Sequence, residues 1–136
     1  AKEAYKIAKK ILNDENLKFI FAENSTAELP FQIHLPKLNN LLVSGIIDRV
    51  INNKNEIIAV DFKSNLLVPK NNKNIPTGIL NQMAIYQEAL SLIYPDKEIK
   101  LAILWVQNST LMYLDKSHLR NLLDQSLALD LLKFDS

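Results

Sequence analysis

The sequence predicts an α/β or α+β sandwich, in which helices flank a mixed β-sheet. Two β-rich runs separated by only four polar residues, 52–55, are typical of a β-hairpin. A segment of helical periodicity and another apolar run of strand type follow this hairpin. Both ends of the chain also carry apolar residues at helical spacing. The order helix, three strands, helix, two strands and helix therefore fits helices packed against one sheet.

The first half of the chain contains one predicted helix and three predicted strands. Residues 1–13 carry apolar side chains at positions i, i+3, i+4 and i+7 with lysines on the other side, which predicts an amphipathic helix. Residues 26–35 have an extended pattern interrupted by Pro30, which favours an edge strand because proline has no N–H for a ladder. Residues 41–51 and 56–63 are the two strands of the hairpin.

The second half begins with a predicted loop. Residues 64–76 are polar and basic and include two prolines. A helix is predicted over 77–94, because a threonine suits its N-cap and a proline follows its last residue. The apolar run 99–106 is typical of a buried strand, and 110–114 is a short strand after a polar turn. Leucines at helical spacing predict a closing helix over 115–134.

Composition bounds the class of protein. A chain of 136 residues, 48% hydrophobic and 23% charged, has the size and composition of a single globular domain spanning 1–136. Its apolar runs are too short to span a membrane, and its first residues do not form a secretory signal peptide. The absence of cysteine excludes disulfides, zinc–thiolate sites and cysteine-ligated iron–sulfur clusters, and it fits a cytoplasmic protein. With a net charge of +1, any affinity for DNA must come from a local patch.

Two carboxylates lie within the apolar strands of the hairpin. Asp48 and Asp61 would each cost several kcal/mol to bury unless a partner compensates the charge. If residues 54–55 form a two-residue loop, Asn53 pairs with Glu56, and counting along an antiparallel ladder places Asp48 opposite Asp61. Opposite side chains share a face and lie roughly 5 Å apart. We therefore expect the two carboxylates to meet, and a bound cation would compensate both.

The chemistry that this pair favours is metal-assisted phosphodiester hydrolysis. Mg²⁺ or Mn²⁺ is the natural hard-cation partner of two carboxylates. Lys63 lies two residues after Asp61, so it shares the face and could orient water or stabilise charge on a phosphate. A D-x-K triplet alone is a weak signal, and Asp48 with Arg49 could be a plain surface ion pair. The combination of two acids brought together by a hairpin is the stronger observation.

Three ordered motifs extend this interpretation: G-I-I-D-R (45–49), I-A-V-D-F-K-S (58–64) and Q-M-A-I-Y-Q-E-A-L (82–90). Together they resemble the signature of the RecB-family nucleases of the PD-(D/E)XK kind, over residues 28–105. The segments 27–30 and 102–105 look most like the C-terminal nuclease domain of AddA helicase–nucleases from alphaproteobacteria. The resemblance implies a restriction-endonuclease-like core with a central mixed sheet.

The resemblance also implies roles for individual residues. Asp48 and Asp61 would be metal ligands, joined by the backbone carbonyl of Phe62. Lys63 would be the catalytic lysine and Glu28 a supporting acidic residue. Phe62 stands where the family more commonly has tyrosine, which does not affect the chemistry.

Gln82 and Tyr86 are spaced i, i+4 and therefore lie on one face of the predicted helix. Taken alone, they could be a core-facing tyrosine with an incidental glutamine. With the resemblance, we expect both to line the nuclease cleft, near the phosphates or the catalytic lysine. The loop 64–74, with Lys70 and Lys73, is expected to lie beside the site and to be mobile without DNA, since its second half has little apolar content.

By resemblance, the chain would be a metal-dependent DNA exonuclease or endonuclease acting in double-strand break repair. It would be a C-terminal piece of a longer AddAB- or RecBCD-like protein, which fits its start at Ala1. A helicase domain in the same full-length chain, an AddB-like subunit and DNA, as double-strand ends and unwound single strands, would be its partners.

One family feature has no match in the sequence. Family members carry a metal-binding histidine on a helix before the first strand, and residues 1–13 contain none. His34 and His118 are more typical of surface histidines. The missing ligand is expected upstream, so the 136 residues alone would bind metal weakly and cut poorly or not at all.

Three other readings remain open. A catalytically incomplete relative could serve DNA binding or subunit interaction, although the acids and Lys63 argue against it. An iron–sulfur nuclease is disfavoured by the lack of cysteine. A restriction-type endonuclease is disfavoured by the Q-x-x-x-Y motif.

Overall fold

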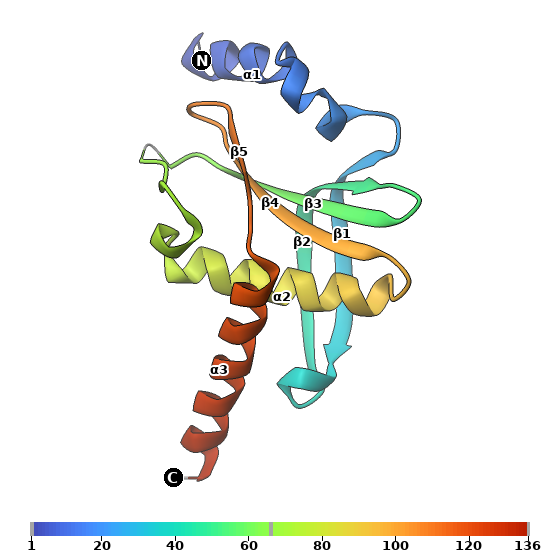
Figure 1. Cartoon of the computed structure of the whole chain (residues 1–136), viewed down its shortest axis with the longest axis vertical. Helices are drawn as coiled ribbons and strands as arrows, with labels where there is room; N and C mark the ends of the chain where they lie inside the picture. Colours follow the sequence, from blue (N-terminus) through green and yellow to red (C-terminus); the bar gives the residue numbers. More distant parts are fainter. Residues whose placement is uncertain (1, 66, 136) are drawn as a thin grey trace.

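A computed structural model describes residues 2–65 and 67–135, with side chains described as far as residue 125 (Figure 1). Over these residues the strands form one five-stranded sheet in the order β1-β2-β3-β4-β5. The strands are β1 (Ser25–Leu35), β2 (Leu41–Asn52), β3 (Glu56–Lys63), β4 (Glu98–Trp105) and β5 (Thr110–Tyr113). The helices are α1 (Lys2–Leu12), α2 (Thr77–Ile93) and α3 (Lys116–Asp135), with 3-10 turns η1 (Glu15–Phe21), η2 (Pro36–Leu38) and η3 (Asn72–Asn74).

The sheet is mixed, as the sequence predicts. All neighbouring strands are antiparallel except β3 and β4, which are parallel and are connected through α2. All eight predicted helices and strands are present in the predicted order. The one addition before β1 is η1, where the Asp14 side chain caps Asn16 N–H at 2.9 Å and Leu17 and Ile20 are buried. No helix among the described residues is both long and apolar enough to cross a membrane.

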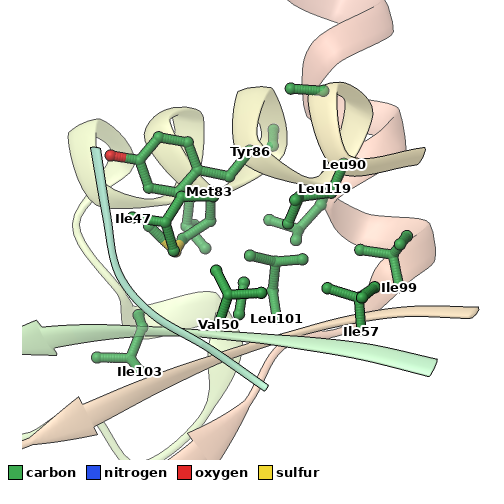
Figure 2. Close-up of a cluster of buried hydrophobic side chains, with 14 of the residues drawn as sticks. Ile47, Val50, Ile57, Met83, Tyr86, Leu90, Ile99, Leu101, Ile103 and Leu119 are labelled. Carbon is green, nitrogen blue, oxygen red and sulfur yellow. The ribbon is translucent and has the colours of Figure 1, made fainter. Parts of the chain in front are cut away.

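Two apolar clusters cover the two faces of the sheet. The larger one lies between the sheet and helices α2 and α3, and Figure 2 shows strand side chains such as Ile57 and Leu101 pointing toward α2. The smaller one joins the opposite face to α1 and η1 through Ile11, Leu17 and Ile20. Each cluster buries one side of an alternating strand pattern, which fixes the direction of the side chains along β3.

The hairpin of β1 and β2 changes face near its middle. In a regular strand Ile47 and Val50 would point to opposite sides, yet both belong to the cluster under α2. The β2–β3 ladder also ends at the pair Arg49 and Val60, while β1 and β2 stay paired to Leu41. Directly across from this point Glu28 has φ 50°, a left-handed conformation that is uncommon for a residue with a side chain. Beyond Arg49, the β1–β2 hairpin therefore leaves the rest of the sheet.

Gly45 lies where this hairpin meets α2. A Cβ atom at Gly45 would approach the Phe31 ring to 2.9 Å and the Tyr86 ring to 3.3 Å. These two rings already pack edge to face, with centroids 5.5 Å apart. The glycine of the G-I-I-D-R motif therefore allows β2 to pass close to Tyr86.

The loop between β3 and α2 is anchored. The Asn72 amide donates a hydrogen bond to the carbonyl of Tyr113 at 3.2 Å and accepts one from the N–H of Asp115 at 2.7 Å. Ile75 is buried in the core under α2. The expectation from the sequence rests on apolar anchors alone, whereas Asn72 ties the second half of the loop to the end of β5 by polar contacts. The mobility of the loop without DNA stays a prediction.

We predict that Gly45→Val destabilises the protein by about 1–3 kcal/mol, because the larger side chain overpacks the contact with Phe31 and Tyr86. Chemical denaturation would measure the free energy of unfolding. Gly78→Ala is the matched control, since a Cβ at Gly78 meets nothing within 4 Å and Gly78 lies in α2. The control should stabilise by roughly 0.5–1 kcal/mol. A Gly45→Val protein as stable as wild type would contradict the close approach.

Candidate active site

Asp48 and Asp61 face each other at the end of the β2–β3 ladder. The register runs through Arg49 with Val60 and Asn52 with Ile57, so it brings Asp48 opposite Asp61 as the hairpin count predicts. The closing bond of the two-residue loop, from Asn53 N–H to the Glu56 carbonyl, is 2.9 Å long. The predicted register is therefore confirmed.

A side-chain hydrogen bond connects β2 to β3 just beyond the last backbone pair of their ladder. Oδ2 of Asp48 accepts a hydrogen bond from the backbone N–H of Phe62 at 2.7 Å. Phe62 lies between Asp61 and Lys63, so the carboxylate of β2 fixes the segment of β3 that carries both. The distance is at the short end of the range for an N–H···O hydrogen bond.

Asp61 is a buried acid with an unsatisfied oxygen. Its side chain is 5% exposed, and its Oδ2 lies 2.8 Å from the Lys63 ammonium. Despite this ion-pair distance, the same oxygen has no partner with hydrogen-bond geometry among the described residues. The ammonium therefore attracts this oxygen by its charge but leaves it an acceptor position for another ligand.

The electrostatics of Asp61 follow from this position. Burial raises the pKa of the Asp61 carboxyl above its ordinary value, Lys63 acts in the lowering direction, and repulsion from Asp48 adds to the rise. The net direction means that the folded protein disfavours two bare carboxylates side by side. A cation would remove this penalty.

Lys63 is held from α2 by a chain of three hydrogen bonds. Its ammonium donates to Oε1 of Gln82 at 3.2 Å, and Nε2 of Gln82 donates to the Tyr86 hydroxyl at 2.9 Å. That hydroxyl donates to the backbone carbonyl of Ile46 at 3.2 Å. Gln82 and Tyr86 therefore lie where the helical spacing places them, on the face of α2 that meets the lysine.

The direction of this chain is fixed at its far end. The Ile46 carbonyl can only accept, so Tyr86 must donate to it and accept from Gln82. The carbonyl is available because its ladder partner Pro30 has no N–H and because β3 pairs with β2 only from Arg49 onward. Burial, followed by repulsion from Asp61, raises the pKa of Tyr86, which keeps its hydroxyl protonated.

Other sequence-predicted residues stay apart from this centre. Glu28 lies across the ladder from Asp48, but its side chain is exposed and has no hydrogen bond or ion pair among the described residues. His34 contacts the carbonyl of Asn40 at 3.0 Å, within the far end of the hairpin. His118 lies in the first turn of α3. The described residues contain no group of three or more His, Cys, Asp or Glu able to hold a metal ion.

Two features of the site could not be recognised from a sequence motif. The Ile46 carbonyl anchors Tyr86, and every residue has such a carbonyl, so only the strand divergence singles it out. Arg49 is not paired with Asp48 in a surface ion pair, because it lies on the opposite face and bonds to the Ile20 carbonyl and to Ser25. The alternating pattern of a strand could have separated Asp48 from Arg49.

A family model of the PD-(D/E)XK nuclease superfamily matches residues 2–129. The chain belongs to the PD-(D/E)XK nuclease superfamily. No curated protein matches it. The membership confirms the nuclease superfamily predicted from the three motifs, while the narrower RecB and AddA resemblance remains a proposal.

One solved structure shares the fold of this domain. A proposed exonuclease from Eubacterium rectale is 18% identical, with a TM-score of 0.66 over 97% of this chain. The chain spans about half of that structure, 51% of its length. A second structure, of SSO0001, is 15% identical over 94% of this chain and 67% of that one, and its TM-score of 0.38 carries no argument.

Nucleases of this superfamily generally use divalent metals, and the residues present fit such an ion. The orphaned Oδ2 of Asp61 and the facing Asp48 supply the oxygen ligands that Mg²⁺ and Mn²⁺ prefer. Magnesium commonly binds through one or two carboxylates and keeps several waters, so two acids are a sufficient start. Asp48, Asp61 and the Phe62 carbonyl are the groups that would hold it.

We predict that Asp61→Asn raises the melting temperature of the metal-free protein at pH 7 by a few degrees, on the order expected for about 1 kcal/mol. A raised pKa in the folded state means that the ionised acid destabilises the fold above that pKa. The gain should shrink as the pH falls and disappear below the unfolded pKa. The lost contact with Lys63 offsets part of it.

Thermal melting at pH 7 and in acid would test this, with the exposed Asp96→Asn as control. A lower melting temperature for Asp61→Asn at pH 7, with no dependence on pH, would show that the buried charge is well compensated without metal.

Proposed function

We propose that this domain is a divalent-metal-dependent nuclease that hydrolyses phosphodiester bonds of DNA. The observation that supports it most is the arrangement of Asp48, Asp61 and Lys63 at the point where β2 and β3 separate. Two facing acids, one with an unsatisfied oxygen, and an ammonium 2.8 Å from that oxygen are the parts that metal-assisted hydrolysis needs.

Each residue then has a distinct part in the reaction. A bound divalent cation would supply charge that stabilises the phosphate as it is attacked. Asp48 and Asp61 hold the cation, while the ammonium of Lys63 stabilises negative charge on the phosphate and orients the attacking water. Oε1 of Gln82 accepts a hydrogen bond from that ammonium and fixes its direction. Because these groups are already in place, little reorganisation is needed when charge develops on the phosphate.

We further propose a RecB- or AddA-like context for the activity. The support is the Q-x-x-x-Y motif, whose Gln82 and Tyr86 contact each other and connect to Lys63. In this context the domain would be part of a longer cytoplasmic helicase–nuclease with an AddB-like partner. It would degrade double-strand ends and unwound single strands during break repair, with Glu28 in a supporting role.

A second candidate function is a catalytically incomplete domain that binds DNA or a partner subunit. One observation favours it: within the described residues only two acids meet, and neither His34 nor His118 joins them. The two proposals differ in whether metal-dependent cleavage is observed at all.

We expect Asp61→Ala or Lys63→Ala in the full-length protein to lower DNA cleavage by roughly 10³-fold, since each removes a charge from the reacting centre. Cleavage of a labelled duplex with Mg²⁺ or Mn²⁺ would measure the loss. Asp96→Ala is the control, because that acid is exposed at the turn after α2. If Asp61→Ala cleaves as fast as wild type, the catalytic assignment is wrong.

Tyr86→Phe should lower kcat by about tenfold and Gln82→Ala by more, with KM for DNA within about twofold, because both loosen Lys63 and neither removes a charge. Steady-state kinetics would separate the two constants. Tyr113→Phe is the matched control, since Tyr113 is 48% exposed on β5. A change confined to KM would instead mean that Gln82 and Tyr86 bind substrate directly.

A further inference from the structure

Arg49 follows Asp48 in the chain but points to the opposite face of the sheet. Its guanidinium donates to the Ile20 carbonyl at 3.0 Å and to Oγ of Ser25 at 2.9 and 3.2 Å. In the described part of the chain no carboxylate lies within ion-pair distance of Arg49, although the side chain is half-buried. A half-buried cation with only neutral hydrogen-bond partners calls for an explanation.

Arg49 has one further partner, the aromatic ring of Phe21. The Arg49 guanidinium carbon is 5.2 Å from the centroid of the Phe21 ring, a cation–π contact. The Phe21 ring in turn packs against the Phe62 ring, with centroids 6.3 Å apart and planes tilted by 46°. Arg49, Phe21 and Phe62 therefore form a stack on the face of the sheet opposite α2.

Phe62 is the residue through which this stack reaches the active site. Its side chain lies on the far face, whereas its backbone N–H donates to Asp48. Beyond Val60, β3 has no further ladder pair with β2, although β4 still pairs with its other edge, and two side-chain connections lead from β2 to this end of β3. Asp48 makes one of them directly, and Arg49 makes the other through Phe21.

The surroundings of Phe62 make the second contact important. Phe62 is half-buried, packs against the smaller apolar cluster and lines an apolar groove between α1 and the sheet, so part of its ring is open to that groove. Phe21 is its aromatic neighbour on this face of the sheet. If Phe21 moved, the Phe62 ring would lose its aromatic neighbour, and Asp48 would remain the direct hold of β2 on the Phe62 backbone, whose other edge pairs with β4.

We propose that Arg49 is a positioning residue of the metal site. By holding Phe21 against Phe62, it helps to fix the backbone of Phe62, whose N–H orients Asp48 and whose carbonyl is the third oxygen proposed for the cation. The inference rests on the proposed nuclease function. It differs from an ordinary tether of η1 to the sheet, which would affect stability alone.

The test compares Arg49→Ala, Arg49→Lys and Phe21→Leu in the full-length protein. Binding of Mn²⁺ without DNA is measured by calorimetry, beside kcat, KM and melting temperature. For Arg49→Ala we expect Mn²⁺ affinity and kcat to fall about 10–100-fold, the range seen when partners that orient ligands are removed. KM for DNA should stay within about twofold, since Arg49 does not face the substrate side.

The other variants test whether Arg49 acts through Phe21. Arg49→Lys keeps a cation over Phe21 but not the forked donors, so it should recover part of the loss. Arg49→Ala combined with Phe21→Leu should be little worse than Phe21→Leu alone, because the two residues act through one contact. Arg120→Ala, which removes the other arginine from the exposed side of α3, should change nothing. If Arg49→Ala does not fold, Arg49→Lys and Phe21→Leu carry the same test.

The outcomes separate the two proposals. Unchanged Mn²⁺ affinity and kcat in the variants, even with a lower melting temperature, would overturn the role of Arg49 and leave the nuclease function standing. Wild-type protein that binds Mn²⁺ but does not cut DNA would overturn the nuclease function, and the Mn²⁺ affinities of the variants would still decide the role of Arg49. Wild-type protein that neither binds nor cuts would overturn both.

Discussion

The hydrogen bond from the Phe62 N–H to the Asp48 carboxylate is the interaction on which the site depends. It lies just beyond the last backbone pair between β2 and β3, so a side chain of β2 connects the two strands where their backbones no longer pair. The separation of the strands leaves room for a substrate, and the hydrogen bond keeps Asp61 and Lys63 from moving with the free end. Without it, this end of β3 would still pair with β4, but it would lose its direct connection to β2, and Asp48 would lose its fixed position beside Asp61.

Both faces of the sheet contribute to holding β3. On one face α2 holds Lys63 through Gln82 and Tyr86, and on the other Arg49 and Phe21 pack beneath Phe62. Because consecutive strand residues point to opposite faces, β3 can present the carboxylate of Asp61 and the ammonium of Lys63 on one face while Phe62 anchors it on the other. The other edge of β3 needs no such side-chain contacts, since β3 and β4 pair along their full lengths.

Much of this arrangement could be predicted from the sequence because it follows from spacing. A two-residue loop fixes the pairing of an antiparallel hairpin, and that pairing brought Asp48 opposite Asp61. The helical spacing of Gln82 and Tyr86 likewise placed them on one face. What could not be predicted depends on tertiary contacts: the change of face beside Glu28, the acceptor role of the Ile46 carbonyl and the anchoring of a polar loop by Asn72. The carbonyl and the asparagine leave no mark on a periodic pattern, and the change of face interrupts the regular alternation that an argument from periodicity assumes.

The geometry of the β2–β3 hairpin also determines where in the hairpin residues can be inserted. The loop at residues 54–55 lies at the opposite end of β2 and β3 from the site, so extra residues there would lengthen a turn and leave the ladder as it is. A single residue inserted between Arg49 and Asn52 would reverse the side on which Asp48 emerges and separate it from Asp61. Related chains can therefore differ freely in the turn, while the four-pair ladder between turn and site admits only changes that preserve its alternation.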